Sequence, residues 1–328
     1  METVLLGPEA VKSVIEIGDV VDAVEAAFVA EASGNAQMPA KSYVDLPQYG
    51  GDFRSMPAYL DTGEFEGAAV KWVNVHPDNP ADHDLPTVMG TIVYTDPETG
   101  FPLAILDGTT ITRLRTGAAA AVATKYLARE DASSLGLVGA GQQAYTQLAA
   151  IATVRDIETV IVADTDRAAV EAFLDRFGDR FDVREGTIDE AAACDVVSTI
   201  TPVRDPIVMA VGERTHVNAM GADAAGKHEI ADAVLEDARL VIDDYEQCVH
   251  SGELNVPYSE GVLTDDDIGA ELGAVVAGEV PGRTEATGVT VFDSTGLAIQ
   301  DVAASHVAYE SAQAAGLGED YRLVDTTS

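Results

Sequence analysis

The sequence predicts an α/β protein in which a doubly wound parallel sheet is accompanied by a second, sheet-containing α+β domain. The chain has 328 residues, more than one core usually holds, so two domains are expected. A buried strand at 135–138 leads into a glycine-rich turn, and further apolar runs alternate with helical segments up to residue 292. Such alternation is typical of a parallel sheet covered by helices. Strand-like runs ahead of residue 106 indicate the second domain.

The glycine-rich turn reads Gly139-Ala140-Gly141-Gln142-Gln143-Ala144. Such a turn between a strand and a helix lets the backbone approach a pyrophosphate, and the helix N-terminus favours its negative charge. The later run 159–163 ends in Asp164, where a carboxylate can bind both hydroxyls of an adenosine ribose. The pattern therefore predicts an NAD site. NADP is disfavoured, because Asp164 would repel a 2′-phosphate and only Arg167 lies nearby to offset that repulsion.

The segments before this turn predict two helices, then strands, then a third helix. Apolar residues at helical spacing from residue 8 to residue 32 indicate two amphipathic helices, separated near Gly18-Asp19 by a new N-cap. Residues 41–106 carry short strand-like runs divided by turns. The alanine-rich segment 110–126 reads as a long helix, and the domain boundary is expected near Arg115.

The segments after Asp164 predict four further strands of the parallel sheet. These strands are expected at 196–200, 216–221, 240–243 and 289–292. Because the sheet ends near Phe292, the apolar face of the segment after Gln300 must be buried elsewhere. We expect this segment to form a helix that returns to the first domain.

The composition excludes several classes of partner. The chain has 56 acidic and 19 basic residues, a formal net charge of -37, which repels nucleic acid and anionic membranes. The acids are scattered in short clusters, the pattern of a protein adapted to concentrated salt, so an extreme halophile is the expected source. The chain shows neither a signal peptide nor a membrane span, and a cytoplasmic protein is expected. The 2 cysteines and 6 histidines have no metal-ligand spacing, so no metal is predicted.

The few basic residues are candidates for function. Lys71 lies within an apolar strand, where a charge is costly unless it is paired or used. With Arg54 and Arg115 it could form a cationic pocket for a small carboxylate. Structural alternatives stay open: Lys71 could be an edge-strand lysine with its ammonium in solvent, and both arginines could form structural salt bridges. Lys41, at the start of a strand, is considered with them, against the alternative of an exposed loop lysine.

Asp223 follows a predicted strand and lies at the carboxyl edge of the sheet, where open α/β sheets bind ligands. A carboxylate beside a nicotinamide and a cationic pocket could move protons to and from a substrate amine. Alternatively, Asp223 could be the N-cap of a following helix. Lys227 could reach the cofactor or pair with Asp223.

Eight short segments, spread in order over most of the chain, form a far more specific set than the glycine turn alone. They are Arg54-Ser55-Met56-Pro57-Ala58, Val70-Lys71-Trp72-Val73-Asn74-Val75-His76-Pro77, Leu85-Pro86-Thr87, Leu106-Asp107-Gly108-Thr109, Leu114-Arg115-Thr116-Gly117-Ala118, Gly139-Ala140-Gly141-Gln142, Gly221-Ala222-Asp223 with Gly226-Lys227, and Phe292-Asp293-Ser294-Thr295-Gly296. Together they resemble the family of ornithine cyclodeaminase, mu-crystallin and archaeal alanine dehydrogenase.

This resemblance implies a Rossmann domain at 116–299, inserted into a substrate-binding and dimerisation domain made of 1–115 and 300–328. It implies that Lys41, Arg54, Lys71 and Arg115 hold the substrate carboxylate or act on it, and that Asp223, with Lys71, is catalytic. The implied cofactor residues are Thr87, Arg115, Thr116, Gly139, Ala140, Gly141, Gln142, Asp164, Ser198, Thr199, Met220, Gly221, Lys227 and Ser294. A homodimer is expected.

Members of this family oxidise the carbon that bears an amine and differ in the fate of the imine. The segments around Lys71, Thr87 and Thr109 look more like those of archaeal alanine dehydrogenases. The resemblance therefore favours NAD-dependent, reversible oxidative deamination of a small L-amino acid, such as L-alanine to pyruvate and ammonia. The alternatives are an ornithine cyclodeaminase, which forms proline and ammonia while recycling NAD, and a ketimine reductase or ligand-binding protein of the mu-crystallin type.

Overall fold

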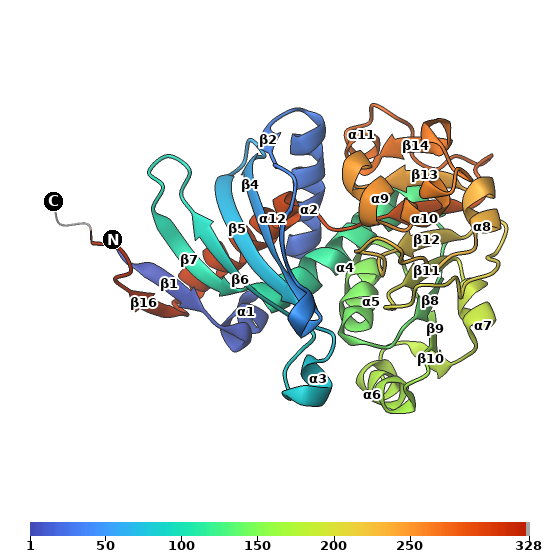
Figure 1. Cartoon of the computed structure of the whole chain (residues 1–328), viewed down its shortest axis with the longest axis horizontal. Helices are drawn as coiled ribbons and strands as arrows, with labels where there is room; N and C mark the ends of the chain where they lie inside the picture. The colour runs from blue at the N-terminus through green and yellow to red at the C-terminus, as the bar shows by residue number, and fades with distance from the viewer. Residues whose placement is uncertain (326–328) are drawn as a thin grey trace. The chain divides into compact units, whose positions relative to one another are not determined.

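The computed structural model describes residues 1–325 and divides the chain into two compact units (Figure 1). The first unit consists of residues 1–115 together with the segment that begins at residue 297. The second unit consists of residues 116–296. Each unit has its own eight-stranded sheet.

The sheet of the first unit has the strand order β16-β1-β7-β6-β5-β4-β2, with β3 beside β4. Its strands are β1 (Thr3–Leu6), β2 (Ala36–Gln37), β3 (Ser42–Leu46), β4 (Gly51–Asp61), β5 (Glu66–Val75), β6 (Val88–Thr95), β7 (Pro102–Asp107) and β16 (Glu319–Tyr321). Only β1 and β7 pair in parallel among these strands. Side chains alternate between the two faces, so Lys71 is buried in β5 while Val70 and Trp72 on either side are exposed.

One face of this sheet packs against α2 (Ile17–Ala32) and α12 (Ala298–Ala315). The helix predicted after Gln300 is thus α12, and it packs on β4, β5 and β6. The other helical segments of this unit are α1 (Pro8–Val14), η1 (Pro47–Tyr49) and α3 (Asn79–Asp82).

The predicted break between the first two helices at Gly18-Asp19 is wrong. The first helix, α1, ends at Val14, and Glu16 is the N-cap of α2. Asp19 lies in the first turn of α2 instead. An acidic side chain is favourable there because it faces the positive end of the helix dipole, so an aspartate early in a helix does not by itself mark the cap.

The sheet of the second unit has the order β10-β9-β8-β11-β12-β15-β13-β14, and all its strands are parallel. They are β8 (Ser134–Val138), β9 (Thr159–Ala163), β10 (Asp182–Glu185), β11 (Val196–Thr199), β12 (His216–Ala219), β13 (Arg239–Ile242), β14 (Ile268–Glu271) and β15 (Thr290–Asp293). The predicted α/β fold class with a doubly wound parallel sheet is confirmed.

Helices cover both faces of this sheet, and its inner strands are buried on both sides. The helical segments are α5 (Gln142–Val154), α6 (Arg167–Phe177), α7 (Ile188–Ala192), α8 (Asp232–Asp237), α9 (Tyr245–Ser251), α10 (Asn255–Ser259), η2 (Asp265–Asp267) and α11 (Leu272–Val276). One apolar cluster contains Leu135 and Leu137, and another contains Val197 and Val217. Burial on both faces explains why these strands read as continuous apolar runs.

The helix α4 (Gly108–Leu127) begins in the first unit and ends in the second. This is the long helix predicted for residues 110–126. Among residues 1–325, no helix is long and apolar enough to cross a membrane.

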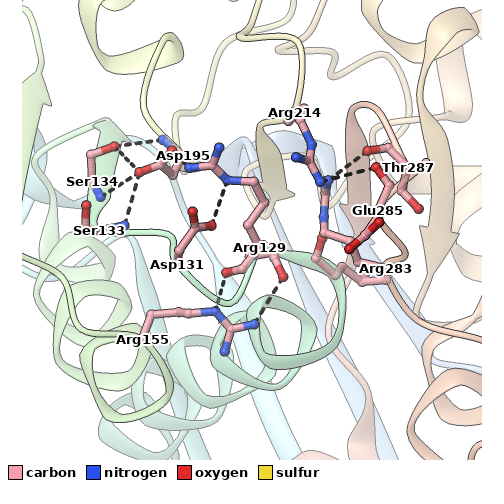
Figure 2. A network of polar contacts seen from close by, with 12 residues as sticks. Arg129, Asp131, Ser133, Ser134, Arg155, Asp195, Arg214, Arg283, Glu285 and Thr287 are labelled. Atoms are coloured by element: carbon pink, nitrogen blue, oxygen red, sulfur yellow. Dashed lines mark hydrogen bonds and ion pairs between the residues drawn. The ribbon is translucent and has the colours of Figure 1, made fainter.

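Asp195 joins the amino ends of β8 and β11 in the second unit (Figure 2). Its carboxylate accepts hydrogen bonds from the amides of Ser133 and Ser134, both at 3.1 Å, and from the Ser134 hydroxyl at 2.8 Å. Arg129 adds an ion pair at 2.7 Å, and Arg155 donates to the Arg129 carbonyl at 2.8 Å. These contacts fix the edge of the sheet opposite to the carboxyl ends of its strands.

Candidate active site

The glycine turn follows β8 and has the geometry of a pyrophosphate-binding turn. Gly139 has a φ of +112°, and its amide donates to the Ala163 carbonyl at 2.8 Å. A Cβ at Gly139 would lie 3.1 Å from Ile200, so glycine is needed for both conformation and space. Gly141 is the N-cap of α5, has no capping side chain, and a Cβ there would meet no atom within 4 Å. The uncapped start of a 13-residue helix and the open space beside Gly141 fit a dinucleotide pyrophosphate.

Asp164 lies directly after β9, half-buried beside the same turn. Its carboxylate accepts hydrogen bonds from the amides of Ala140 at 2.6 Å and Asp166 at 2.8 Å. A carboxylate has about four acceptor positions, so two are left for ribose hydroxyls. The residue therefore both stabilises the turn and fits the ribose.

The other predicted cofactor residues of the second unit lie mostly where its strands end. Ser198 and Thr199 end β11, Met220 and Gly221 follow β12, and Ser294 follows β15. The strand order changes direction between β8 and β11, and open α/β sheets bind ligands at that point.

Two of these serines are held by neighbouring side chains. Ser198 is buried and donates to Gln147 of α5 at 2.9 Å, and Gln147 in turn donates to the Thr116 carbonyl at 3.4 Å. Ser294 donates to Asp243 at 2.8 Å. Thr87, by contrast, belongs to the first unit, where its carbonyl accepts from the His76 amide at 2.8 Å.

Asp223 lies in the loop between β12 and α8, and no helix begins beside it. The alternative that it caps a following helix is therefore wrong: the loop continues to Asp232, where α8 starts. Asp223 forms an ion pair with Lys227, and 35% of its side chain is exposed. Asp223 is therefore paired with a cation and remains accessible to a ligand.

A buried group of charges lies in the first unit, between the sheet and α12. Lys71 of β5 contacts both carboxylate oxygens of Asp301 at 2.8 and 2.7 Å, and its side chain is 1% exposed. Arg115 of α4 reaches Asp301 at 3.3 Å and donates to Gln300 at 3.1 Å. The Thr112 hydroxyl accepts from Lys71 at 3.3 Å. Lys71 is on an inner strand and buried, so the alternative of an edge-strand lysine in solvent is wrong.

The surroundings of Lys71 lower the pKa of its ammonium to about 7. Burial is the largest cause, because it disfavours the charged form; nearby Arg115 and Lys41 act in the same direction. Asp301 opposes them by charge and hydrogen bonding. Lys71 can therefore gain or lose a proton near neutral pH.

The other two predicted substrate residues also lie in the first unit. Arg54 of β4 is buried and forms a two-pronged contact with Asp52, at 2.8 and 3.1 Å. Lys41 is half-buried just before β3 and is close enough to lower the pKa of Lys71. The first unit thus gathers the predicted cations, and two acids pair with three of them.

The acids Asp52 and Asp301, together with Gln300 and Thr112, were missed by the sequence reasoning. A signal existed for Gln300 and Asp301, which are adjacent polar residues in the helix whose apolar face was expected to be buried. No group of side chains among residues 1–325 has a metal-binding arrangement.

The sequence model of the ornithine cyclodeaminase/mu-crystallin family matches residues 1–316. The chain belongs to this family. The resemblance predicted from the sequence is thereby confirmed. Among family members, alanine dehydrogenase from Archaeoglobus fulgidus is 47% identical over 326 residues, which cover 98% of this chain and 99% of that protein.

Two solved structures extend the similarity to the fold. An archaeal alanine dehydrogenase dimer with bound NAD has a TM-score of 0.94 and 46% identity, over 99% of this chain and 100% of that one. The Δ1-pyrroline-2-carboxylate reductase of Thermococcus litoralis, solved with NADH and L-proline, has a TM-score of 0.92 and 35% identity, over 97% of this chain and 99% of that one. Both of these solved proteins therefore share the fold described above along nearly the whole chain.

Proposed function

We propose that this protein is an NAD-dependent dehydrogenase that converts L-alanine, or a similarly small L-amino acid, reversibly to the 2-oxo acid and ammonia. The observation that carries the proposal is the buried group of Lys71, Arg115 and Asp301. Two basic side chains share one carboxylate there, so a positive charge is present for the carboxylate of a substrate whenever Lys71 is protonated. The alanine dehydrogenase of A. fulgidus, similar over nearly the whole chain, supports an amino acid as that substrate.

Each residue of the proposed site has a defined role. Lys71 and Arg115 bind the substrate carboxylate, with Arg54 and Lys41 extending the cationic set. Bound NAD would supply the acceptor for the hydride lost from the carbon that carries the amine. Asp223, which pairs with Lys227, would take the proton that the amine loses as the imine forms, and would return protons as water adds to the imine and ammonia leaves.

The proposed NAD site uses the glycine turn from Gly139 to Gln142, with Asp164 on the adenosine ribose. Ser198, Thr199, Met220, Gly221, Lys227 and Ser294 complete it in the second unit, and Thr87, Arg115 and Thr116 are proposed to contact the cofactor as well. Because Asp164 repels a 2′-phosphate, NADH should bind more tightly than NADPH in fluorescence titrations, and Asp164→Ser should narrow the difference. Equal affinities in the unmodified protein would contradict this assignment.

We further propose that the protein is a homodimer in the cytoplasm of an extreme halophile. The face of the first sheet that α12 leaves uncovered carries exposed Val44, Val70 and Trp72, and Phe53 stacks on Trp72 with ring centroids 5.2 Å apart. Exposed apolar faces of this kind mark interfaces. The related archaeal alanine dehydrogenase is a dimer. The net charge of -37 supports the halophilic setting.

One experiment tests the proposed reaction against its alternatives. The protein is incubated in concentrated KCl with NAD and either L-alanine or L-ornithine, and NADH, ammonia and proline are measured. Net NADH with L-alanine is the expected result. Proline and ammonia from L-ornithine without net NADH would instead indicate a cyclodeaminase, and no turnover of either substrate would favour a ligand-binding role.

A further inference from the structure

Glu229 is a buried carboxylate that joins the ends of two neighbouring strands in the second unit. We propose that Glu229 is a positioning residue, which fixes the loop after β12 and thereby places Asp223 for proton transfer. This proposal rests on the proposed function, since it needs Asp223 as the acid/base residue. Glu229 is not among the residues predicted for the site, and it lies well after Asp223 in the sequence.

The contacts of Glu229 span the carboxyl ends of β11 and β12. One carboxylate oxygen accepts hydrogen bonds from the amide and the hydroxyl of Thr201, at 2.8 and 2.7 Å. The other oxygen accepts from the amide of Gly221 at 3.0 Å. Thr201 follows β11 by two residues, and Gly221 follows β12 by two residues. A single side chain therefore sets the separation of two loops at the edge where ligands of such sheets bind.

The backbone at Gly221 lies so close to Glu229 that no side chain fits there. A Cβ at Gly221 would lie 2.2 Å from the Glu229 carboxylate and 2.6 Å from the Thr201 carbonyl. Gly221 is separated from Asp223 by Ala222 alone, and Ala222 is buried. A movement of Gly221 would thus be passed directly to Asp223.

Glu229 is itself held from behind by two further buried carboxylates. Glu253 accepts from the amides of Glu229 and Ile230, at 2.8 and 2.6 Å. Asp293, at the end of β15, accepts from the amides of Glu253 and Leu254, at 2.9 and 3.1 Å. Each carboxylate in this series fixes the backbone that carries the preceding one. The series runs from β15 to the loop of Asp223 and gives Glu229 a rigid support.

The same sheet provides a matched control at its opposite edge. Asp195, like Glu229, accepts from two backbone amides and one hydroxyl and joins the ends of two strands. It does so at the amino ends of β8 and β11, whereas Asp223 follows the carboxyl end of β12. Figure 2 shows the contacts of Asp195. If Glu229 were only a structural clamp, loss of either carboxylate would have the same consequences.

The test compares Glu229→Gln, Glu229→Asp and Asp195→Asn in concentrated salt. Glutamine keeps the volume but turns an amide group toward a donor, and aspartate keeps the charge but is too short to reach both loops. Both Glu229 variants should lose turnover by about 10²-fold, the cost of misplacing a reacting group by about 1 Å. Their KM for L-alanine should change little, and their affinity for NADH should fall far less than their turnover, because Gly221 is only one of the proposed cofactor contacts. Asp195→Asn should keep its turnover while losing thermal stability.

Hydrogen exchange of the protein without substrate gives a second measurement. The amides of Thr201 and Gly221 should exchange faster in both Glu229 variants and normally in Asp195→Asn. If Glu229→Gln does not fold, Thr201→Val, which removes only the hydroxyl contact, should show a smaller loss of turnover with the same unchanged KM. The proposal would be overturned if the Glu229 variants, like Asp195→Asn, kept their turnover and the normal exchange of the Thr201 and Gly221 amides. If the unmodified protein oxidises no amino acid, the proposed function fails. The positioning role is overturned separately if the Thr201 and Gly221 amides exchange no faster in the Glu229 variants than in the unmodified protein.

Discussion

Lys71 shows how one buried residue can be tuned by its neighbours. Burial, Arg115 and Lys41 all disfavour the ammonium, and Asp301 alone among the named groups favours it. The balance brings the pKa of Lys71 to about 7. A substrate carboxylate would add a second favourable charge, so binding should take up a proton when Lys71 is neutral.

We expect the affinity for propionate, which has a carboxylate but no amine, to weaken as the pH rises above about 7. One proton linked to binding changes Kd by at most about tenfold per pH unit. Calorimetric titrations on either side of pH 7 measure the effect. Lys71→Arg should remove the pH dependence, because a guanidinium keeps its charge. Asp301→Asn should make the affinity begin to weaken at a lower pH, because it removes the charge that raises the pKa of Lys71. Affinity that is constant with pH in the unmodified protein would contradict this role for Lys71.

Asp223 is expected to affect turnover far more than binding. Asp223→Asn should lower kcat by about 10² or more, the size of a general acid/base contribution. Affinity for NADH should be preserved, because the proposed pyrophosphate site is the glycine turn at the start of α5. Stopped-flow turnover and NADH titration separate the two effects. Near-normal turnover would show that another group moves the proton.

At this scale the sequence revealed the cations but not their partners. Lys71 is one of few lysines and interrupts an apolar strand, so composition and pattern marked it as a candidate, while an edge-strand position in solvent stayed open. Asp52 and Glu229 are two among 56 acidic residues, and nothing local marks them. Asp301 is marked only by its place in a helix whose apolar face was expected to be buried. Their significance comes from tertiary contacts that join residues far apart in the chain.

At the scale of elements, the pKa values of carboxylates at the two edges of the second sheet are shifted in opposite directions. Asp195, at the amino edge, is partly exposed and lies beside Arg129, and hydrogen bonds from Ser133 and Ser134 lower its pKa against the opposing effect of burial. Asp293, at the carboxyl edge, is buried beside Asp243, and its pKa is raised to about 7, chiefly by burial. The pKa of neighbouring Glu253 is raised well above its ordinary value, also chiefly by burial.

These shifts predict opposite dependences of stability on pH. The stabilising contribution of Asp293 is complete below its unfolded pKa of 3.8 and is lost as the pH rises through about 7. The contribution of Asp195 exists above its unfolded pKa and is lost as the pH falls. The free energy of unfolding, measured with guanidinium chloride across this pH range, should therefore decline less with rising pH for Asp293→Asn than for the unmodified protein. For Asp195→Asn, the free energy of unfolding should instead fall less than that of the unmodified protein as the pH is lowered into the acid range. Parallel curves for all three proteins would contradict the assignment.

The elements that the sequence predicted best are those buried on both faces. The runs at β8, β9, β11, β12, β13 and β15 are mostly apolar and buried along nearly their whole length, and they were recognised. The edge strands β10 and β14 were not predicted, because their residues are mostly exposed or half-buried and include charges. The boundary between α1 and α2 was misplaced because a first-turn aspartate resembles a cap.

At the scale of the whole molecule, the dominant property is the charge of -37. Repulsion among so many carboxylates opposes both folding and association unless salt screens it. The Debye length is about 10 Å at 0.1 M and about 3 Å at 1 M, so molar salt confines repulsion to nearest neighbours. A local example is the exposed pair Glu171 and Asp175, which lie four residues apart on α6 and repel each other.

We therefore expect stability and dimerisation to depend on molar salt. Thermal unfolding and light scattering should show a progressive loss of both as KCl is lowered toward about 0.1 M. Sucrose at equal osmolarity should not restore dimerisation, because it does not screen charge. Asp175→Lys provides a directed control: it places a lysine four residues after Glu171, which replaces a repulsive pair by an attractive one, and it reduces the net negative charge by two, so the variant should need less KCl than the unmodified protein. Full stability and activity of the unmodified protein at about 0.1 M salt would show that its acidic surface is not an adaptation to screening.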